Sequence, residues 1–118
     1  MDTIIIRIKN LRLRTYIGFN PDEKQKKQDV IINVTFNYQA QTAQNEDDMG
    51  DMLNYKIMTK RIIKLVEEQT FLLLEKLTND ILELIFQEPK VAYAKVEVDK
   101  PHALRFSDSV SAEIARSR

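Results

Sequence analysis

The sequence predicts an α+β domain in which an antiparallel sheet of four strands carries two helices on one face. Three observations support this prediction. Apolar and polar residues alternate in four segments, as they do in half-buried strands. Two segments in the middle of the chain repeat apolar residues at helical spacing. The predicted order is therefore strand, strand, helix, helix, strand, strand, which is typical of helices that cover one face of an antiparallel sheet.

The first predicted strand covers residues 3–15 and changes the side that it buries. Before Asn10 the alternating apolar residues are even-numbered, as Ile6 and Ile8 are, and after it they are odd-numbered, as Leu11 and Leu13 are. This change of parity predicts a bulge or a bend around Asn10.

A turn and a charged loop follow this strand. Gly18 and Pro21 predict the turn, and the polar residues 22–27 predict an exposed loop. Glu23 lies in this loop. Taken alone it is most simply a surface charge, although it can also fold back over a cleft.

The second predicted strand covers residues 30–38 and should pair antiparallel with the first. Its even-numbered positions are all apolar or aromatic: Val30, Ile32, Val34, Phe36 and Tyr38. Residues 41–51 are polar and acidic and show no apolar period, so they predict a connection.

Two helices are predicted next. Asn54 is a suitable N-cap for a helix that runs from Tyr55 to about Glu68. Tyr55 lies in its first turn, where an aromatic side chain most simply packs. The second helix is predicted for residues 71–86 and ends before Pro89.

Glu75 stands near the start of the second helix and follows four apolar residues. The helix dipole stabilises a carboxylate at this position even where the side chain is exposed to solvent. The same carboxylate can accept paired hydrogen bonds from an amidine-like edge of a ligand. The sequence pattern leaves both interpretations open.

The third predicted strand covers residues 92–100 and ends among ionisable residues. Its even-numbered positions are small and apolar up to Val98, and Pro101 removes a donor, so pairing should lapse near Lys100. An amine held there by a rigid strand can face a cleft, as a lysine that shuttles protons must. Lys100 and its charged neighbours equally fit a solvated turn.

Residues 108–114 alternate again and predict a fourth strand, which a short basic tail follows. Four long strands in a small domain leave unpaired sheet edges, and closing several sheets into a ring of subunits would remove them. We therefore expect a homo-oligomer.

Length and composition limit the kinds of site. The 118 residues, 43% of them hydrophobic, suffice for one core but not for two. Eighteen basic residues balance eighteen acidic residues, so we expect neither nucleic acid nor a membrane as a partner. The chain has no cysteine and one histidine, which excludes thiolate chemistry and histidine-rich metal sites within one chain. We therefore expect no metal and no other cofactor.

The N-terminal apolar run is short and is broken by Arg7. This pattern fits neither a signal peptide nor a membrane span, so we expect a cytoplasmic protein.

Four short motifs resemble one enzyme family. They are TYIG at 15–18, LNY at 53–55, LLEKL at 73–77 and DKPHALR at 99–105. Over nearly its whole length the chain resembles the dihydroneopterin aldolases and their close relatives, the dihydroneopterin triphosphate 2'-epimerases. The string KPHALR, followed by DSV at 108–110 and preceded by LNY and LEKLT, is more similar to the epimerase branch.

The resemblance implies a tunnelling fold (T-fold), with residues 1–118 as one pterin-binding catalytic domain. Units of the order ββααββ would join into an oligomeric barrel, a tetramer or an octamer, with small-molecule dihydropterin sites between subunits. The resemblance implies that Leu74 and Glu75 bind the pterin and that Tyr55 reaches the same site from a neighbouring subunit. It also implies that Lys100 is an acid/base lysine and that Glu23 lies near the hydroxylated side chain of the substrate.

His102 and Arg105 belong to the epimerase-like string, and from their charge alone we expect them to bind phosphate. The implied reaction inverts C2' of dihydroneopterin triphosphate by retro-aldol and aldol steps with acid–base catalysis. One alternative is an aldolase of folate biosynthesis that releases glycolaldehyde. Another is an oligomer that binds a pterin without catalysis.

Overall fold

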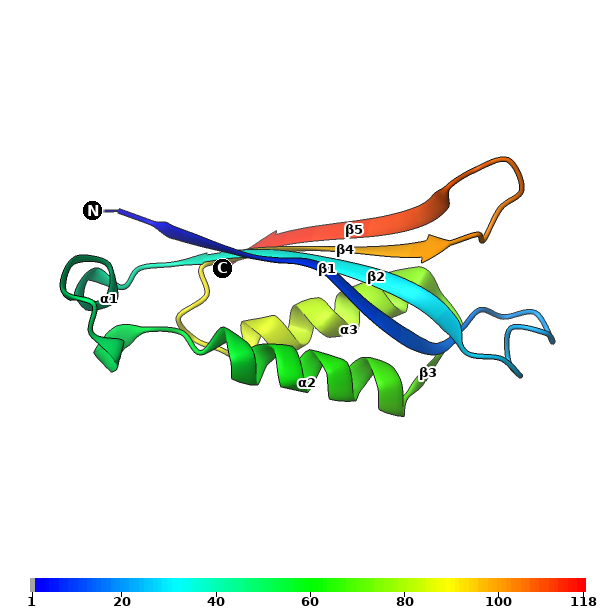
Figure 1. The fold of residues 1–118 in the computed structure, drawn as a ribbon, viewed down its shortest axis with the longest axis horizontal. Helices are drawn as coiled ribbons and strands as arrows, with labels where there is room; N and C mark the ends of the chain where they lie inside the picture. Colours follow the sequence, from blue (N-terminus) through cyan, green and yellow to red (C-terminus); the bar gives the residue numbers. More distant parts are fainter. Residues whose placement is uncertain (1) are drawn as a thin grey trace.

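The computed structural model describes residues 2–118, and a long, curved sheet with helices on one face forms most of it (Figure 1). The strands stand in the order β3-β1-β2-β4-β5. Their bounds are β1 (Ile4–Ile17), β2 (Gln28–Tyr38), β3 (Thr70–Phe71), β4 (Tyr93–Pro101) and β5 (Ser109–Ser117). The helices are α1 (Gln41–Glu46), the 3-10 helix η1 (Met49–Asp51), α2 (Tyr55–Glu68) and α3 (Leu74–Phe86).

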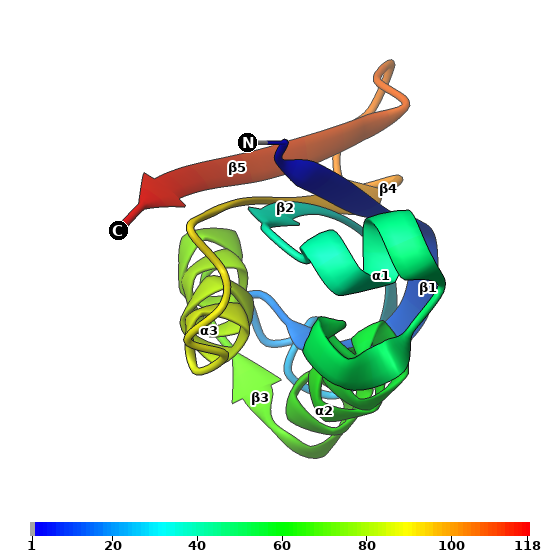
Figure 2. The same cartoon turned by 90° about the vertical axis from the view of Figure 1, so that its left-hand side faces the viewer.

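The core lies between the sheet and the two long helices. Figure 2 shows α2 and α3 side by side under the concave face of the sheet. The even-numbered residues of β2 and β4 point to this face, since side chains alternate along a strand. They meet the buried stripes of the helices: Met58, Ile62 and Val66 of α2, and Leu77, Ile81, Leu82 and Ile85 of α3. In the described part of the chain, residues 2–118, the other face of the sheet has no helix over it (Figure 1).

The bulge predicted in the first strand is confirmed. β1 and β2 pair antiparallel, and their register shifts between Ile8 and Leu11. Asn10 has a φ of 54°, a left-handed conformation that asparagine tolerates better than most residues. Its backbone N–H donates to Asn33 Oδ1 at 2.9 Å, and Asn33 Nδ2 donates back to Asn10 Oδ1 at 3.2 Å. Beyond the bulge, Leu13 turns inward.

The N-cap of α2 is also confirmed. Asn54 Oδ1 accepts hydrogen bonds from the backbone N–H groups of Lys56 at 3.1 Å and Ile57 at 3.2 Å. These groups have no partner inside the helix, so the cap satisfies donors that would otherwise need water.

The prediction of four strands is wrong, because Thr70 and Phe71 form a fifth. They pair in parallel with Tyr16 and Ile17, and the Gly18 N–H donates to the Phe71 carbonyl at 2.9 Å. This pairing holds the chain extended after α2. As a consequence α3 begins at Leu74 and not at residue 71.

The prediction of a plain connection at residues 41–51 is also wrong. This segment contains α1 and η1, and the Asp51 carboxylate accepts hydrogen bonds from the backbone N–H groups of Thr42 and Ala43. The cap of α1 therefore comes from a residue beyond the helix, which local periodicity does not reveal.

The end of β4 differs in part from the prediction. Pairing with β2 ends at Asp99, but pairing with β5 continues to Pro101, opposite Ser109. The His102 N–H donates to the Asp108 carbonyl at 3.3 Å and closes the hairpin. β5 also runs on to Ser117, where the sequence suggested a tail. Within residues 2–118, no helix is both long and apolar enough to cross a membrane.

The cap of α2 gives a first test. Asn54→Ala should lower the free energy of unfolding by about 1 kcal/mol, because two backbone N–H groups lose their acceptor. Denaturant unfolding at one fixed protein concentration measures the change. Asn54→Asp retains an acceptor and serves as the control, so an equal loss in both variants would show that the cap is not the cause.

Candidate active site

Lys100 and Glu23 form an ion pair at the end of the sheet where β4 stops. Lys100 has the same parity as the buried Val96 and Val98, so its side chain leaves β4 toward the helix-covered face. Its ammonium group donates to Glu23 Oε2, 77 residues away in the chain. The two side chains are only 13% and 18% exposed. The fold therefore joins two of the sequence-predicted site residues in a largely buried pair.

The loop between β1 and β2 holds the Glu23 carboxylate in place. Gln28 Nε2 donates to Glu23 Oε2 at 3.1 Å and to the Ile17 carbonyl at 2.7 Å. The Asn20 side-chain oxygen accepts from the Glu23 backbone N–H at 3.0 Å. Backbone and side chain of Glu23 are thus both fixed.

Gly18 makes room for this carboxylate. Its φ is 134°, a conformation that other residues rarely adopt. A Cβ atom at this position would also overlap the Glu23 carboxylate. Both the backbone and the neighbouring side chain therefore require glycine here.

The surroundings of Glu23 favour its ionised form. The hydrogen bond from Lys100 is the largest influence and lowers the pKa of Glu23, burial raises it, and the hydrogen bond from Gln28 lowers it further. The net effect is a pKa below the ordinary value. Near neutral pH Glu23 is therefore a carboxylate held against the Lys100 amine, and a pair of this kind can exchange protons with a bound hydroxyl.

A cavity of about 280 Å³ opens beside this pair. Its walls come from the end of β1, the β1–β2 loop, β3 and the residue after β3: Tyr16, Gly18, Glu23, Lys24, Thr70, Phe71 and Leu72. Glu75 lies in the first turn of α3, three residues after Leu72, and is exposed, whereas Leu74 is half-buried. The structure thus places Leu74 and Glu75 directly after one wall of the cavity.

Tyr55 begins α2, and Figure 1 shows α2 starting at the end of the helix layer opposite β3. The last residues of α2 lead to β3 beside the cavity. A helix of 14 residues spans about 20 Å, so Tyr55 is far from Lys100 in the same chain. The ring is 48% exposed. Within one chain, the structure does not bring Tyr55 to the Glu23–Lys100 pair.

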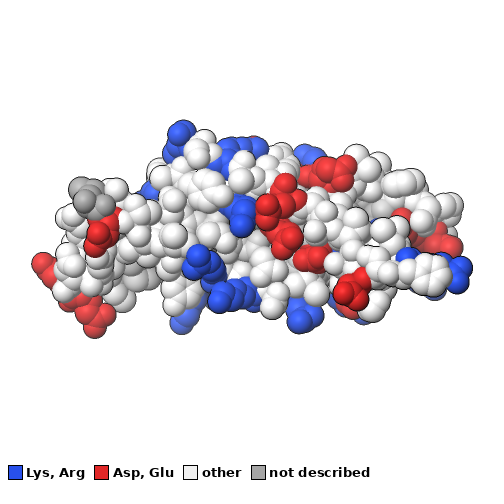
Figure 3. Space-filling model, turned by 90° about the horizontal axis from the view of Figure 1, so that it is seen from above, with Lys and Arg blue, Asp and Glu red and all other residues white. Residues whose placement is uncertain are grey.

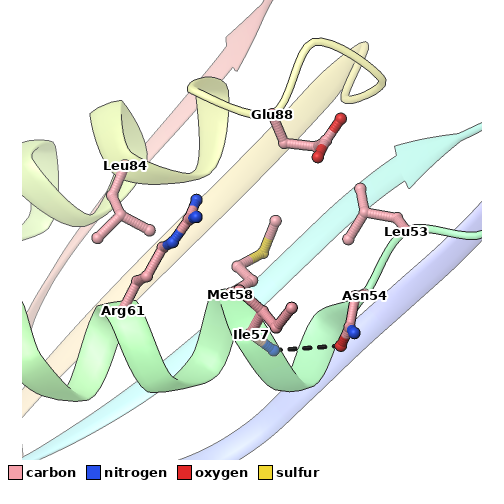
Figure 4. Close-up of a pocket in the computed structure, with 7 residues that line it drawn as sticks. All are labelled: Leu53, Asn54, Ile57, Met58, Arg61, Leu84 and Glu88. Carbon is pink, nitrogen blue, oxygen red and sulfur yellow. Dashed lines mark hydrogen bonds between the residues drawn. The ribbon is translucent and has the colours of Figure 1, made fainter.

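A smaller cavity of about 190 Å³ lies between the helices near Tyr55 (Figure 4). Figure 4 shows the Arg61 side chain extending from α2 toward α3 between Leu84 and Met58. None of the site residues predicted from the sequence lines this cavity.

His102 and Arg105 lie in the hairpin between β4 and β5, which projects beyond the end of the sheet (Figure 1). The Arg105 guanidinium stacks on the fully exposed Phe106 ring, with 5.3 Å between its Cζ atom and the ring centroid. His102 has a φ of 61° and lines a separate cavity with residues of β1 and β2. Within residues 2–118, neither side chain makes a hydrogen bond or an ion pair with Glu23 or Lys100, although all of this segment is one motif in the sequence.

Gln28 is a site residue that the sequence reasoning missed. It has the parity of the buried Val30, so extending the alternation of β2 back by one step would have placed it on the inner face. In residues 2–118, no three His, Asp or Glu side chains gather closely enough to hold a metal ion.

The ion pair should make stability depend on pH. Because the folded-state pKa of Glu23 is lowered, the pair stabilises the fold above about pH 4.5, and this contribution is lost as the pH falls through the lowered value. Glu23→Gln should therefore lower the free energy of unfolding by about 1 kcal/mol at pH 7 and by much less at pH 3. Urea unfolding at both pH values measures the difference.

Asp29→Asn is the matched control for Glu23→Gln. Asp29 pairs with Arg14 at 3.2 Å, but its side chain is 70% exposed, and exposed pairs contribute little. A Glu23→Gln effect that is equally large at pH 3 would mean that the charge of Glu23 is not responsible.

Comparisons with known proteins find a matching family and similar relatives. Residues 6–115 match the family model described as FolB: Dihydroneopterin aldolase. The dihydroneopterin triphosphate 2'-epimerase of Escherichia coli K12 is 52% identical over 97% of this chain and 95% of its own. The epimerase of Pseudomonas aeruginosa is 53% identical over 96% of this chain and 92% of its own.

A solved structure agrees with these sequence matches. The crystal structure of E. coli dihydroneopterin aldolase in complex with neopterin superposes with a TM-score of 0.90 at 25% identity. The superposition covers 99% of this chain and 100% of the aldolase chain. From the fold, the family model and the relatives together, the chain belongs to the dihydroneopterin aldolase family.

Proposed function

We propose that this chain is a dihydroneopterin triphosphate 2'-epimerase, active as a single domain of residues 1–118 within a homo-oligomer. The observation that carries the proposal is the largely buried Glu23–Lys100 pair beside a cavity, in a chain 52% and 53% identical to two such epimerases. The substrate would be a 7,8-dihydropterin with a phosphorylated side chain.

The chemistry of this substrate needs few protein groups. The dihydropterin ring carries a C6=N5 imine whose C6 bears C1'. When the 2'-hydroxyl loses its proton, the C1'–C2' bond can break, its electron pair moves into the ring, and C2' becomes an aldehyde carbon. If the aldehyde rotates and presents its opposite face before C1' attacks it again, the configuration at C2' is inverted. If the aldehyde leaves, the result is aldol cleavage.

The Glu23–Lys100 pair supplies the proton transfers in this scheme. The ionised Glu23 carboxylate can accept a hydrogen bond from the 2'-hydroxyl, and the Lys100 ammonium carries a proton that it can give and take back. The end of β4 holds Lys100, and hydrogen bonds within the β1–β2 loop hold Glu23, so both groups are oriented before a substrate binds.

The pterin ring would bind at the start of α3. Glu75 is exposed there and follows the cavity wall, so its carboxylate can accept two hydrogen bonds from the amidine-like edge of the ring, beside Leu74. Tyr55 would come from a neighbouring subunit, because within its own subunit it lies at the end of α2 that is far from Lys100, and it is half-exposed.

The sheet edges support the oligomer of this proposal. β5 is an edge strand along its whole length, and β1 is covered by β3 only at Tyr16 and Ile17. Unpaired edges of this length invite pairing with another chain. We propose that several copies join edge to edge into the barrel of a tunnelling fold, as a tetramer or an octamer, with sites between subunits.

Aldol cleavage of dihydroneopterin is the second candidate function. The family model is named for the aldolase, and the matched aldolase structure holds neopterin. Both reactions begin with the same C1'–C2' cleavage, and they differ in whether the aldehyde is retained.

Product analysis separates the two functions. The wild type should convert dihydroneopterin triphosphate mainly to its 2'-epimer, and dihydroneopterin should give relatively more 6-hydroxymethyl-dihydropterin. Chromatography of both reactions measures the ratio. If cleavage dominates and the triphosphate is not turned over, the aldolase assignment replaces the epimerase assignment.

Mixed oligomers test whether the site is shared between subunits. Lys100→Ala and Tyr55→Ala should each lose a large part of the rate, on the order of 10²–10⁴ for the acid/base lysine. Co-expressed subunits of the two variants should regain activity at about a quarter of the sites, where Lys100 and Tyr55 come from different chains. Activity no higher than the sum of the separate variants would place both side chains in one subunit's site or outside it.

A further inference from the structure

A second cavity near Lys100 lies over the face of the sheet that carries no helix. Its volume is about 540 Å³, which is within the range of small-molecule sites. The lining includes Arg12 and Arg14 of β1, Asp29 and Ile31 of β2, and Pro101 and His102 at the end of β4. Figure 3 looks onto this face and shows basic and acidic side chains close together on it.

The orientation of the two arginines follows from the bulge in β1. Leu13 is buried, so its neighbours Arg12 and Arg14 point away from the helices. Their guanidinium groups therefore lie on the open face, where a polyanion could reach them without entering the core.

Of the two arginines, Arg12 is the free one. Arg14 Nε lies 3.2 Å from Asp29 Oδ1, and Arg14 Nη2 donates to the Lys27 carbonyl at 3.1 Å. Between residues 2 and 118, neither Arg12 nor the His102 ring makes an ion pair or a side-chain hydrogen bond. Asp29 is thus paired with Arg14, and Arg12 retains a full set of donors.

This cavity is close enough to Lys100 to share a substrate with it. Pro101 and His102 follow Lys100 directly, so the Cα atoms of Lys100 and His102 are at most about 7 Å apart. The cavity and the ion pair lie on opposite faces of the sheet but at the same end, where pairing between β2 and β4 has stopped. A flexible side chain on a bound ring can pass around this end.

We propose that Arg12, assisted by the His102 ring, binds the phosphates of the substrate's side chain. The inference rests on the proposed function and assigns the specificity for a phosphorylated substrate. A guanidinium group can give two parallel hydrogen bonds to a phosphate, and the imidazole can add a third. Arg105 does not line this cavity, and its guanidinium group lies over the Phe106 ring in the projecting hairpin. Phosphate binding would hold the cleaved aldehyde in the site and favour inversion over release.

The main test compares two substrates. In Arg12→Ala, the ratio of kcat/KM for dihydroneopterin triphosphate to that for dihydroneopterin should fall about tenfold or more, mostly through KM. Arg12→Lys keeps the positive charge but not the two parallel donors of a guanidinium group. Its ratio should therefore lie between those of Arg12→Ala and the wild type. Arg7→Ala is the matched control, because Arg7 is exposed on β1, on the same open face but outside the cavity, and should leave the ratio unchanged.

An equal loss for both substrates would overturn the proposal, because Arg12 would then act on the fold or on the reaction itself. An equal effect of Arg7→Ala would overturn it too, because the general charge of the face would then attract the triphosphate. An unchanged ratio in Arg12→Ala would remove Arg12 from the phosphate site.

A binding measurement keeps the inference testable if the proposed function fails. Calorimetry with inorganic triphosphate should show binding to the wild type and to Arg7→Ala, and at least about tenfold weaker binding to Arg12→Ala. Turnover of neither pterin by the wild type would reject the proposed function. Binding that depends on Arg12, with no effect of Arg12→Ala on the substrate ratio, would make the cavity a site for free polyphosphate and overturn its role in holding the substrate.

Discussion

The contact between Glu23 and Lys100 depends on nearly every element at its end of the molecule. Lys100 reaches the helix-covered face because β4 keeps its alternation one step beyond its last pair with β2. Glu23 reaches it because Gly18 leaves space and Gln28 ties the carboxylate to the end of β1. In a pair buried to this extent, loss of one partner leaves the other charge uncompensated. The same constraint that makes the pair vulnerable to mutation keeps two ionisable groups in fixed positions.

Most of the fold could be predicted from the sequence because most of its elements bury one regular stripe. The alternation of β2 and β4, the cap at Asn54 and the parity change at Asn10 are all local signals, and the structure has each of them. β3 and α1 could not be predicted in this way. β3 has two residues and exists only because β1 offers an edge, and α1 is capped by Asp51 from outside the helix. Such partners are set by the tertiary structure, which a local pattern does not contain.

For the candidate site, the sequence suggests which residues to consider but not how the fold arranges them. The string from 99 to 105 reads as one motif, yet Lys100 turns to the helices, His102 lines a cavity on the other face, and Arg105 lies against Phe106. Strand alternation and the left-handed conformation of His102 separate them. Arg12 gave no signal at all, because an arginine between two apolar residues of a strand is the ordinary pattern of a solvent-exposed face.

The bulge at Asn10 adds one residue to β1. Before the bulge the even-numbered side chains of β1 face the helices, and after it the odd-numbered ones do. This one extra residue therefore places Leu13 and Ile17 in the core and leaves Arg12 outside. Deleting that residue would leave every side chain unchanged in chemistry and would rotate half of β1 by one step. Both faces of the sheet near Lys100 would then be rebuilt at once. The arrangement of side chains near Lys100 therefore depends on the number of residues in the bulge of β1.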